Sequence, residues 1–153
     1  MHKLFEQVRE FHKAFGHPSP DTVGFKEARL LLRCKLILEE ATEFFAAAGY
    51  HNIGDQDFSP TGEKPDMVKM VDGLIDLLYV TYGTLVEMGC DPEMLADEVH
   101  RSNMAKLGPD GKPLARTDGK ALKPPGWTPP DIEGVLEKMG FDTCQKEKGD
   151  GSP

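Results

Sequence analysis

The chain has 153 residues, three cysteines and a formal net charge of −8. This length predicts a single domain, over residues 1–142 with a flexible tail at 143–153, and the surplus of acids argues against a general nucleic-acid or anionic-membrane binder. Widely spaced cysteines without a C-x-x-C pattern favour neither a disulfide framework nor a zinc site. We find no signal-peptide pattern and no apolar run near the roughly 20 residues of a membrane helix, so we expect a cytoplasmic protein.

The first predicted helix carries one apolar stripe. Leu4, Val8, Phe11 and Phe15 follow a helical spacing, and Gly16 ends the pattern. His12 and His17 on or after this helix are expected to be solvated, because a lone histidine at a helix surface usually is.

Two long helices are predicted in the middle of the chain, at about 25–48 and 65–88. Gly49 and Gly89 provide natural ends for them, and the Gly, Pro, Asp and Ser content of residues 51–65 predicts a loop. The centre of the second helix, residues 74–80, is apolar on every side except at Asp76. That pattern predicts the buried middle of a helical bundle.

The last third of the chain combines two helices with a basic segment. Asp91 and Pro92 form a good start for a helix that ends near residue 106, and Thr128 is expected to cap a short helix that ends at Gly140. Between them, residues 106–127 hold five basic side chains against two acidic ones, a local charge of +3 that could attract phosphate. Strand-like alternation is absent from the sequence. The predicted fold class is therefore all-α, with four main helices and a short C-terminal one.

Carboxylates occupy positions in the two long helices where leucines would be expected. Glu39, Glu40 and Glu43 lie in one run of the first long helix, and Asp72 and Asp76 lie one turn apart on the second. Burying unpaired carboxylates is unfavourable, and like charges one turn apart repel. Ordinary surface acids are the alternative, but Asp76 in an apolar run is hard to place in solvent. We therefore predict a Mg²⁺ site, since this ion prefers carboxylate oxygens.

A di-iron centre is a second metal chemistry that helical bundles support. It requires paired Glu-x-x-His motifs. The sequence contains none, and offers only the single pair Asp97 and His100. This chemistry is not favoured.

Four segments in a fixed order carry a resemblance to a known family. They are EEATE at 39–43, DLLYVTYG at 76–83, EVHRSNMAK at 98–106 and DGKALKPPGW at 118–127. Together they resemble the MazG-like all-α nucleoside triphosphate pyrophosphohydrolases, closest to small phage and bacterial members grouped with phosphoribosyl-ATP pyrophosphohydrolase. The resemblance implies hydrolysis of an NTP, or a dNTP such as dUTP, to a nucleoside monophosphate and pyrophosphate with Mg²⁺ or Mn²⁺.

The resemblance also implies roles for the acids. Glu40, Glu43 and Asp76 would hold Mg²⁺. The family usually has a second acid three residues before Asp76, where this chain has Gly73, and Asp72 is the nearest replacement. Glu39 is our choice for general base, because it is not the acid most embedded in the apolar stripe and can approach a water.

Substrate contacts are expected from the basic part of the chain. Asn103 and Lys106 resemble the family's Asn-x-x-Lys substrate pair, and Lys120 and Lys123 are expected to close over the triphosphate. The alternative for the latter two is a solubilising loop. Trp127 is expected to pin this segment to the bundle rather than to stack on a base.

Two other functions remain open from the sequence. One is hydrolysis of phosphoribosyl-ATP, and the other is a non-catalytic acidic bundle that binds a nucleotide or a partner. The apolar stripes exceed what one layer of helices can cover, and the family builds its bundle across subunits. A homodimer or a dimer of dimers is therefore predicted.

Overall fold

The structure is a computed structural model that describes residues 3–108, 110–113 and 122–143. Its internal contacts divide the chain into two compact units, Met1–Gly89 and Cys90–Pro153. Each unit is described by itself. The single domain over residues 1–142 stays a prediction, and the predicted tail lies almost wholly outside the described residues.

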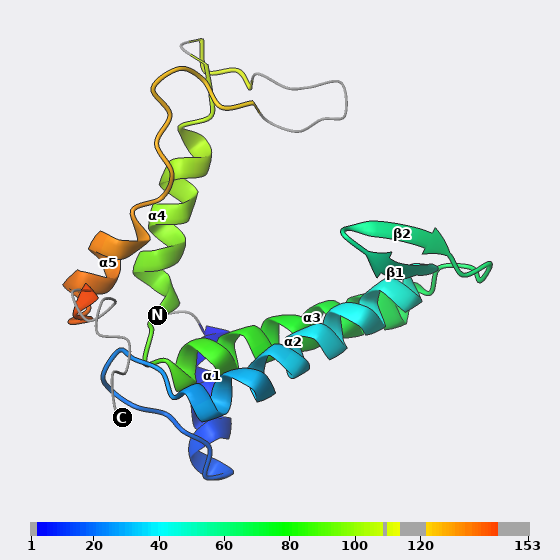
Figure 1. Cartoon of the computed structure of the whole chain (residues 1–153), viewed down its shortest axis with the longest axis horizontal. Coiled ribbons are helices and arrows are strands. Elements are labelled where there is room, and N and C mark those ends of the chain that lie inside the picture. The colour runs from blue at the N-terminus through cyan, green and yellow to red at the C-terminus, as the bar shows by residue number, and fades with distance from the viewer. Residues whose placement is uncertain (1–2, 109, 114–121, 144–153) are drawn as a thin grey trace, which may run out of the picture. The chain divides into compact units, whose positions relative to one another are not determined.

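The first unit contains the three helices that the sequence predicts. They are α1 at Lys3–Ala14, α2 at Glu27–Ala47 and α3 at Met67–Glu87. Figure 1 shows α2 and α3 side by side along their length, and α1 packs against α3. Arg29, near the start of α2, donates a hydrogen bond to Glu87 at the end of α3, which shows that these two helix ends lie close together. The two long helices are therefore antiparallel.

The hydrophobic core of the first unit lies between α1 and α3. Phe5, Val8 and Val86 are buried there. The partly buried side chains around them are Leu4, Tyr79, Tyr82 and Leu85. The rings of Phe5 and Tyr82 meet edge to face, with centroids 6.1 Å apart. The apolar stripe predicted for the first helix is confirmed only in part. Val8 is buried and Leu4 is partly buried, but Phe15 is 66% exposed, and Phe5, which the stripe did not include, is buried.

A β-hairpin replaces the loop predicted between the long helices. Strands β1 (Tyr50–Gly54) and β2 (Asp57–Pro60) pair antiparallel, and Asp55 and Gln56 form the turn with positive φ angles of 44° and 67°. The prediction was wrong because neither strand has a buried face, so no alternation of apolar and polar residues is required.

The centre of α3 is not buried within one chain. Leu74, Ile75 and Leu78 are 42%, 51% and 46% exposed, whereas Gly73 and Gly83 are buried. The prediction of a buried middle is wrong for the single chain, because α1 and α2 cover only part of this helix. The chain is mostly helical with one small sheet, while the four-helix bundle stays a prediction.

The second unit pairs α4 (Pro92–Met104) with α5 (Ile132–Lys138). Asp91 caps α4 as predicted, accepting a bond of 2.9 Å from the backbone N–H of Glu93. The cap of α5 is Asp131, which accepts from Gly134, so the prediction of Thr128 as the cap was wrong. Asp131 stands directly before the first helical residue and reaches the free amides of that turn.

No helix in the described ranges is both long and apolar enough to cross a bilayer.

Candidate functional site

Two close contacts define the interface between α2 and α3, called here the seam. At one end Gly83 faces Arg33, and a methyl group on this glycine would lie 2.6 Å from Nη2 of Arg33. At the other end Gly73 faces Phe44, whose backbone nitrogen would lie 3.2 Å from such a methyl group. Side chains seven residues apart share a helix face. Glu40 and Asp76 therefore lie along the seam between these two contacts.

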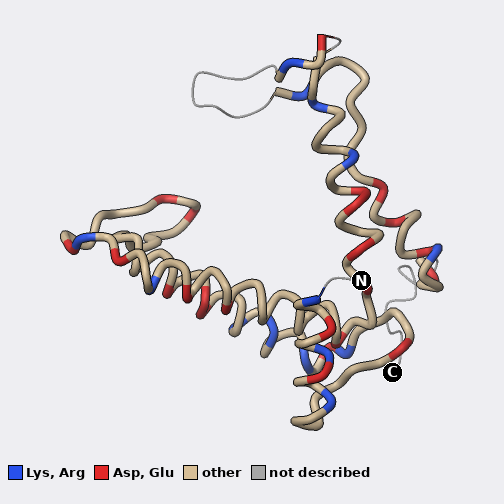
Figure 2. Tube along the Cα trace, turned by 180° about the vertical axis from the view of Figure 1, so that it is seen from behind, with Lys and Arg blue, Asp and Glu red and all other residues tan. Residues whose placement is uncertain are grey.

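The five predicted acids gather around Glu40. Burial raises the pKa of Glu40, and four neighbouring carboxylates raise it further. These neighbours are Asp76, Glu43, Glu39 and Asp72, from the larger effect to the smaller. Figure 2 shows acidic positions following one another along the α2–α3 pair. The structure thus brings together all five carboxylates that the sequence singled out.

The chemistry of this donor set fits a hard divalent cation. Carboxylate oxygens and water are what Mg²⁺ prefers, and a cation would remove the repulsion that raises the pKa of Glu40. Within the described residues, however, no three His, Cys, Asp or Glu side chains are close enough together to hold one metal ion. The acids share one region without forming a preassembled cage, so their individual ligand roles stay predictions.

Asp76 is exposed, contrary to the expectation that its apolar surroundings would bury it. Its neighbours Ile75 and Leu78 are exposed as well, because α1 and α2 leave this side of α3 uncovered within the first unit. Glu39, Glu43 and Asp72 are also exposed, and only Glu40 is half-buried. An open row of carboxylates around a half-buried one is accessible to a charged ligand.

Packing explains why position 73 holds glycine where an acid is usual. Gly73 is buried, and a side chain there would press on the backbone of Phe44, whose Cα would lie 3.4 Å from the first added carbon. A side chain at this position would therefore require the backbone of Phe44 to shift by a few tenths of an ångström. Asp72, the adjacent residue, is exposed and contributes to the raised pKa of Glu40. The acid near this position is therefore Asp72.

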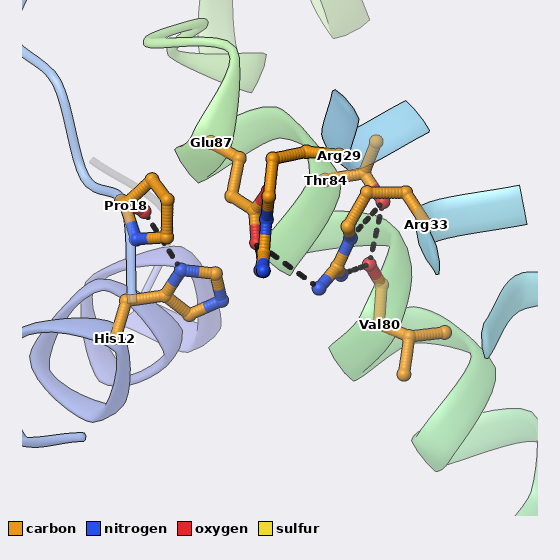
Figure 3. A network of polar contacts seen from close by, with 7 residues as sticks. All are labelled: His12, Pro18, Arg29, Arg33, Val80, Thr84 and Glu87. Atoms are coloured by element: carbon orange, nitrogen blue, oxygen red, sulfur yellow. Dashed lines mark hydrogen bonds and ion pairs between the residues drawn. The ribbon is translucent and has the colours of Figure 1, made fainter. Parts of the chain in front are cut away.

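The opposite end of the seam holds an ion-pair network that sequence reasoning missed (Figure 3). Arg29 donates to both carboxylate oxygens of Glu87, at 3.1 and 2.7 Å. Arg33 lies 3.5 Å from Glu87 and also donates to Thr84 Oγ1 and to the carbonyl of Val80. Burial opposes the charged form of Glu87, but the arginines outweigh it and lower its pKa. The available signal was two arginines one turn apart in an apolar helix.

His12 belongs to the same network. It is buried, whereas we expected from the sequence that it would be solvated. It is 3% exposed, and its Nδ1 lies 3.0 Å from the carbonyl oxygen of Pro18, to which it donates. Burial lowers the pKa of His12; the bond to Pro18 opposes this, and the charge on Arg33 adds to it. The ring therefore ties the end of α1 to the following turn. The expectation failed because α3 presents Gly83 to this ring and leaves room for it.

The second unit brings together three of the four predicted substrate residues. Lys106 donates to Asn103 at 2.7 Å, and the Lys123 ammonium lies 4.2 Å from the centroid of the Trp127 ring. Trp127 Nε1 donates to the carbonyl of Ser102 at 2.8 Å, so Trp127 holds this segment against α4, while the predicted pinning to a four-helix bundle stays a prediction. Lys120 lies outside the described residues.

Comparison with known proteins assigns the family. The sequence model of the phosphoribosyl-ATP pyrophosphohydrolase family matches residues 8–103, which is more than half of the chain. The chain belongs to the phosphoribosyl-ATP pyrophosphohydrolase family. The match runs from the middle of α1 through most of α4, so it contains all five candidate acids of this family member, whereas Lys106, Lys120 and Lys123 lie beyond it.

A solved structure is also similar to this family member. It is a protein from Exiguobacterium sp. 255-15, named as a candidate NTP pyrophosphohydrolase, with 30% sequence identity. The alignment covers 91% of this chain and 94% of that one, with a TM-score of 0.41. No curated protein matches the chain.

Proposed function

We propose that the protein hydrolyses a nucleoside triphosphate to a nucleoside monophosphate and pyrophosphate with Mg²⁺. The observation that carries the proposal is Glu40, half-buried among four other carboxylates. In the described part of the chain none of the five acids forms an ion pair. A cation from solution is therefore the partner that this group of side chains requires, and membership of a pyrophosphohydrolase family supports the reaction.

In the proposed reaction the acids divide into ligands and a base. Glu40, Glu43 and Asp76 would hold the metal, with Asp72 beside them. Mg²⁺, or Mn²⁺, would neutralise charge on the phosphate oxygens when bound. Glu39 is exposed and would accept a proton from the water that attacks the α-phosphorus. The bond from that phosphorus to the bridging oxygen then breaks, and pyrophosphate leaves.

Substrate contacts are proposed for Asn103, Lys106, Lys120 and Lys123. The pair Asn103 and Lys106 is already joined by a hydrogen bond, which fixes the ammonium at the end of α4. Lys123 lies over the Trp127 ring, so that face of the indole is used by a cation. This arrangement supports phosphate binding by Lys123, and it argues against stacking of a nucleobase on Trp127.

The exposed apolar surface of α2 and α3 supports the proposed homodimer or dimer of dimers. Several large side chains of these helices are at least half exposed: Leu31, Leu38, Met67, Val68, Val71 and Ile75. Apolar surface on this scale marks an interface. Size-exclusion chromatography with light scattering tests this, and a monomer of 16.9 kDa would contradict it.

The reaction is tested by product analysis over all ribo- and deoxyribonucleoside triphosphates, dUTP included, with Mg²⁺ and with Mn²⁺. We expect a monophosphate and pyrophosphate in equal amounts. Release of orthophosphate as the first product would contradict the proposal.

Phosphoribosyl-ATP is a second candidate substrate, favoured by membership of the phosphoribosyl-ATP pyrophosphohydrolase family. It is assayed beside the triphosphate panel, and the larger kcat/KM identifies the preferred substrate. Nucleotide binding without turnover on any of these compounds would instead support a non-catalytic bundle.

A further inference from the structure

A groove of about 500 Å³ lies beside the gathered acids, between the end of α2 and the start of α3. Glu43 and Asp72, two of the candidate metal ligands, line it. Lys64 and Lys69 line it as well, and no sequence motif singled out either lysine. The groove therefore places two positive charges next to the candidate metal site.

Backbone hydrogen bonds fix the walls of this groove. The segment after the hairpin is bound to the end of α2 at both of its ends, through Thr61 N–H to Gly49 O at 2.8 Å and Asp66 N–H to Ala47 O at 2.9 Å. The Asp66 carboxylate accepts from the backbone amide of Lys69 at 3.2 Å and caps α3. Lys64 and Lys69 thus project from anchored backbone.

The charges of the groove decide what it can bind. Its lining has four carboxylates, from Glu43, Glu63, Asp66 and Asp72, against two ammonium groups, a net charge of −2. Neither lysine forms an ion pair with any described residue. Without metal, such a groove repels a polyanion. A divalent cation on Glu43 and Asp72 would neutralise it and leave both lysines available to an anion.

We propose that this groove binds the pyrophosphate part of the substrate, with Lys64 and Lys69 contacting the β- and γ-phosphates. The inference rests on the proposed function, because Glu43 and Asp72 belong to its metal site. Apart from two alanines, every residue that lines the groove is charged, and none is aromatic. A nucleobase would find no ring to stack on, whereas a phosphate chain finds two cations.

The test is calorimetric titration of the full-length protein with pyrophosphate in the presence of Mg²⁺. We expect K64A/K69A to weaken pyrophosphate binding about 10-fold or more. Each lysine is expected to donate a charge-assisted hydrogen bond to a phosphate oxygen, and the variant loses the binding free energy of both bonds. K64R/K69R should retain binding, because arginine keeps the charge. Nucleoside monophosphate, which lacks the β- and γ-phosphates, should bind K64A/K69A as it binds the wild type.

The matched control is K26A. Lys26 precedes α2 and lies 13 residues before Glu39, roughly 20 Å along a helix. This variant should bind pyrophosphate as the wild type does. Binding of Mg²⁺ alone should not be weakened in K64A/K69A, because the removed charges repel the cation, and this result would show that the metal site is intact. Pyrophosphate binding that is as strong without Mg²⁺ as with it would overturn the inference.

The failure of this inference and the failure of the proposed function give different results. If the wild type releases pyrophosphate from a triphosphate but K64A/K69A binds pyrophosphate normally, the lysines are excluded and the reaction stands. Suppose instead that the wild type hydrolyses no nucleotide but binds pyrophosphate in the presence of Mg²⁺, and that K64A/K69A does not bind it. The groove assignment then stands and the reaction is rejected. Absence of pyrophosphate binding to the wild type would overturn the inference.

Discussion

Glu40 and Glu87 lie on the same pair of helices, and their surroundings change their pKa values in opposite directions. Glu87 is bound by Arg29 and Arg33, and its pKa is lowered. Glu40 is half-buried among other carboxylates, and its pKa is raised. The countercharge of Glu87 therefore comes from the chain itself, whereas the described part of the chain supplies none for Glu40.

This difference separates a structural carboxylate from a candidate functional one. The Glu87 side chain is only 6% exposed and its oxygens are used by arginine, so it has no capacity for a ligand. Glu40 has neighbours of its own sign and no ion pair within the described residues. The like-charged carboxylates around Glu40 repel one another without a counterion, and the proposed cation site depends on this observation.

The largest expected effect is on catalysis at the acid end. E40Q should lower kcat/KM by about 10³-fold, because loss of a metal ligand removes several kcal/mol of transition-state stabilisation. The same change removes one of several like charges, so the metal-free protein should become more stable. Steady-state kinetics and urea unfolding measure the two effects. E27Q, in the first turn of α2, should leave activity unchanged, and full activity of E40Q would contradict the site.

The next effect is on stability at the ion-paired end. E87Q should lower the free energy of unfolding by about 3–5 kcal/mol, because it leaves the buried Arg33 without its partner charge. Urea unfolding measures it. The matched control is D21N, which breaks the exposed pair of Arg9 and Asp21 and should cost at most about 1 kcal/mol. Equal effects of the two changes would contradict a structural role for Glu87.

A smaller effect is expected where the helices approach most closely beside the acids. G73E creates the acid pattern usual in the family, but its side chain would press on the backbone of Phe44. We expect a loss of about 1–3 kcal/mol in unfolding free energy, and no gain in activity. D72E keeps the acid at the exposed position and is the control. Higher activity in G73E would show that position 73, rather than Asp72, is the natural place for the acid.

The smallest effect is a difference in pH dependence. The raised pKa of Glu40 means that the folded state binds more protons above pH 4.5, so this group lowers stability as pH rises. The stability gained by E40Q over the wild type, without metal, should therefore grow from pH 4.5 upward. The lowered pKa of Glu87 has the opposite sign, so the loss in E87Q should shrink as pH falls below 4.5. Unfolding curves across pH test both, and parallel curves for the two variants would contradict the comparison.

Added Mg²⁺ should reverse the loss of stability that Glu40 causes as pH rises. Protons compete with the metal for Glu40, so Mg²⁺ should stabilise the wild type more at pH 7 than at pH 4.5. The same addition should have little effect on E40Q. Thermal unfolding with and without Mg²⁺ measures this, and equal stabilisation of both proteins would contradict metal binding at Glu40.

Local patterns in the sequence were sufficient for the helices and for the set of acids. Helical periodicity, glycine ends and the Asp91 cap depend on neighbouring residues only, and the structure confirms them. The proximity of Glu40 and Asp76 agrees with the prediction from the sequence that both acids belong to one metal site. The hairpin could not be predicted, because its exposed strands carry no alternation.

Burial and partnership were decided by the tertiary structure. The sequence of α3 does not show that Leu74 and Ile75 are exposed in one chain, because exposure depends on which other helices cover that face. It does not show that Gly73 and Gly83 face α2, that His12 is buried beside Arg33, or that Lys64 and Lys69 line the same groove as Glu43. The sequence determined which charges exist and on which helices they lie. Only the packing of α2 against α3 decided which of them are neutralised within the chain, because electrostatic interaction depends on distance and burial and not on separation along the chain.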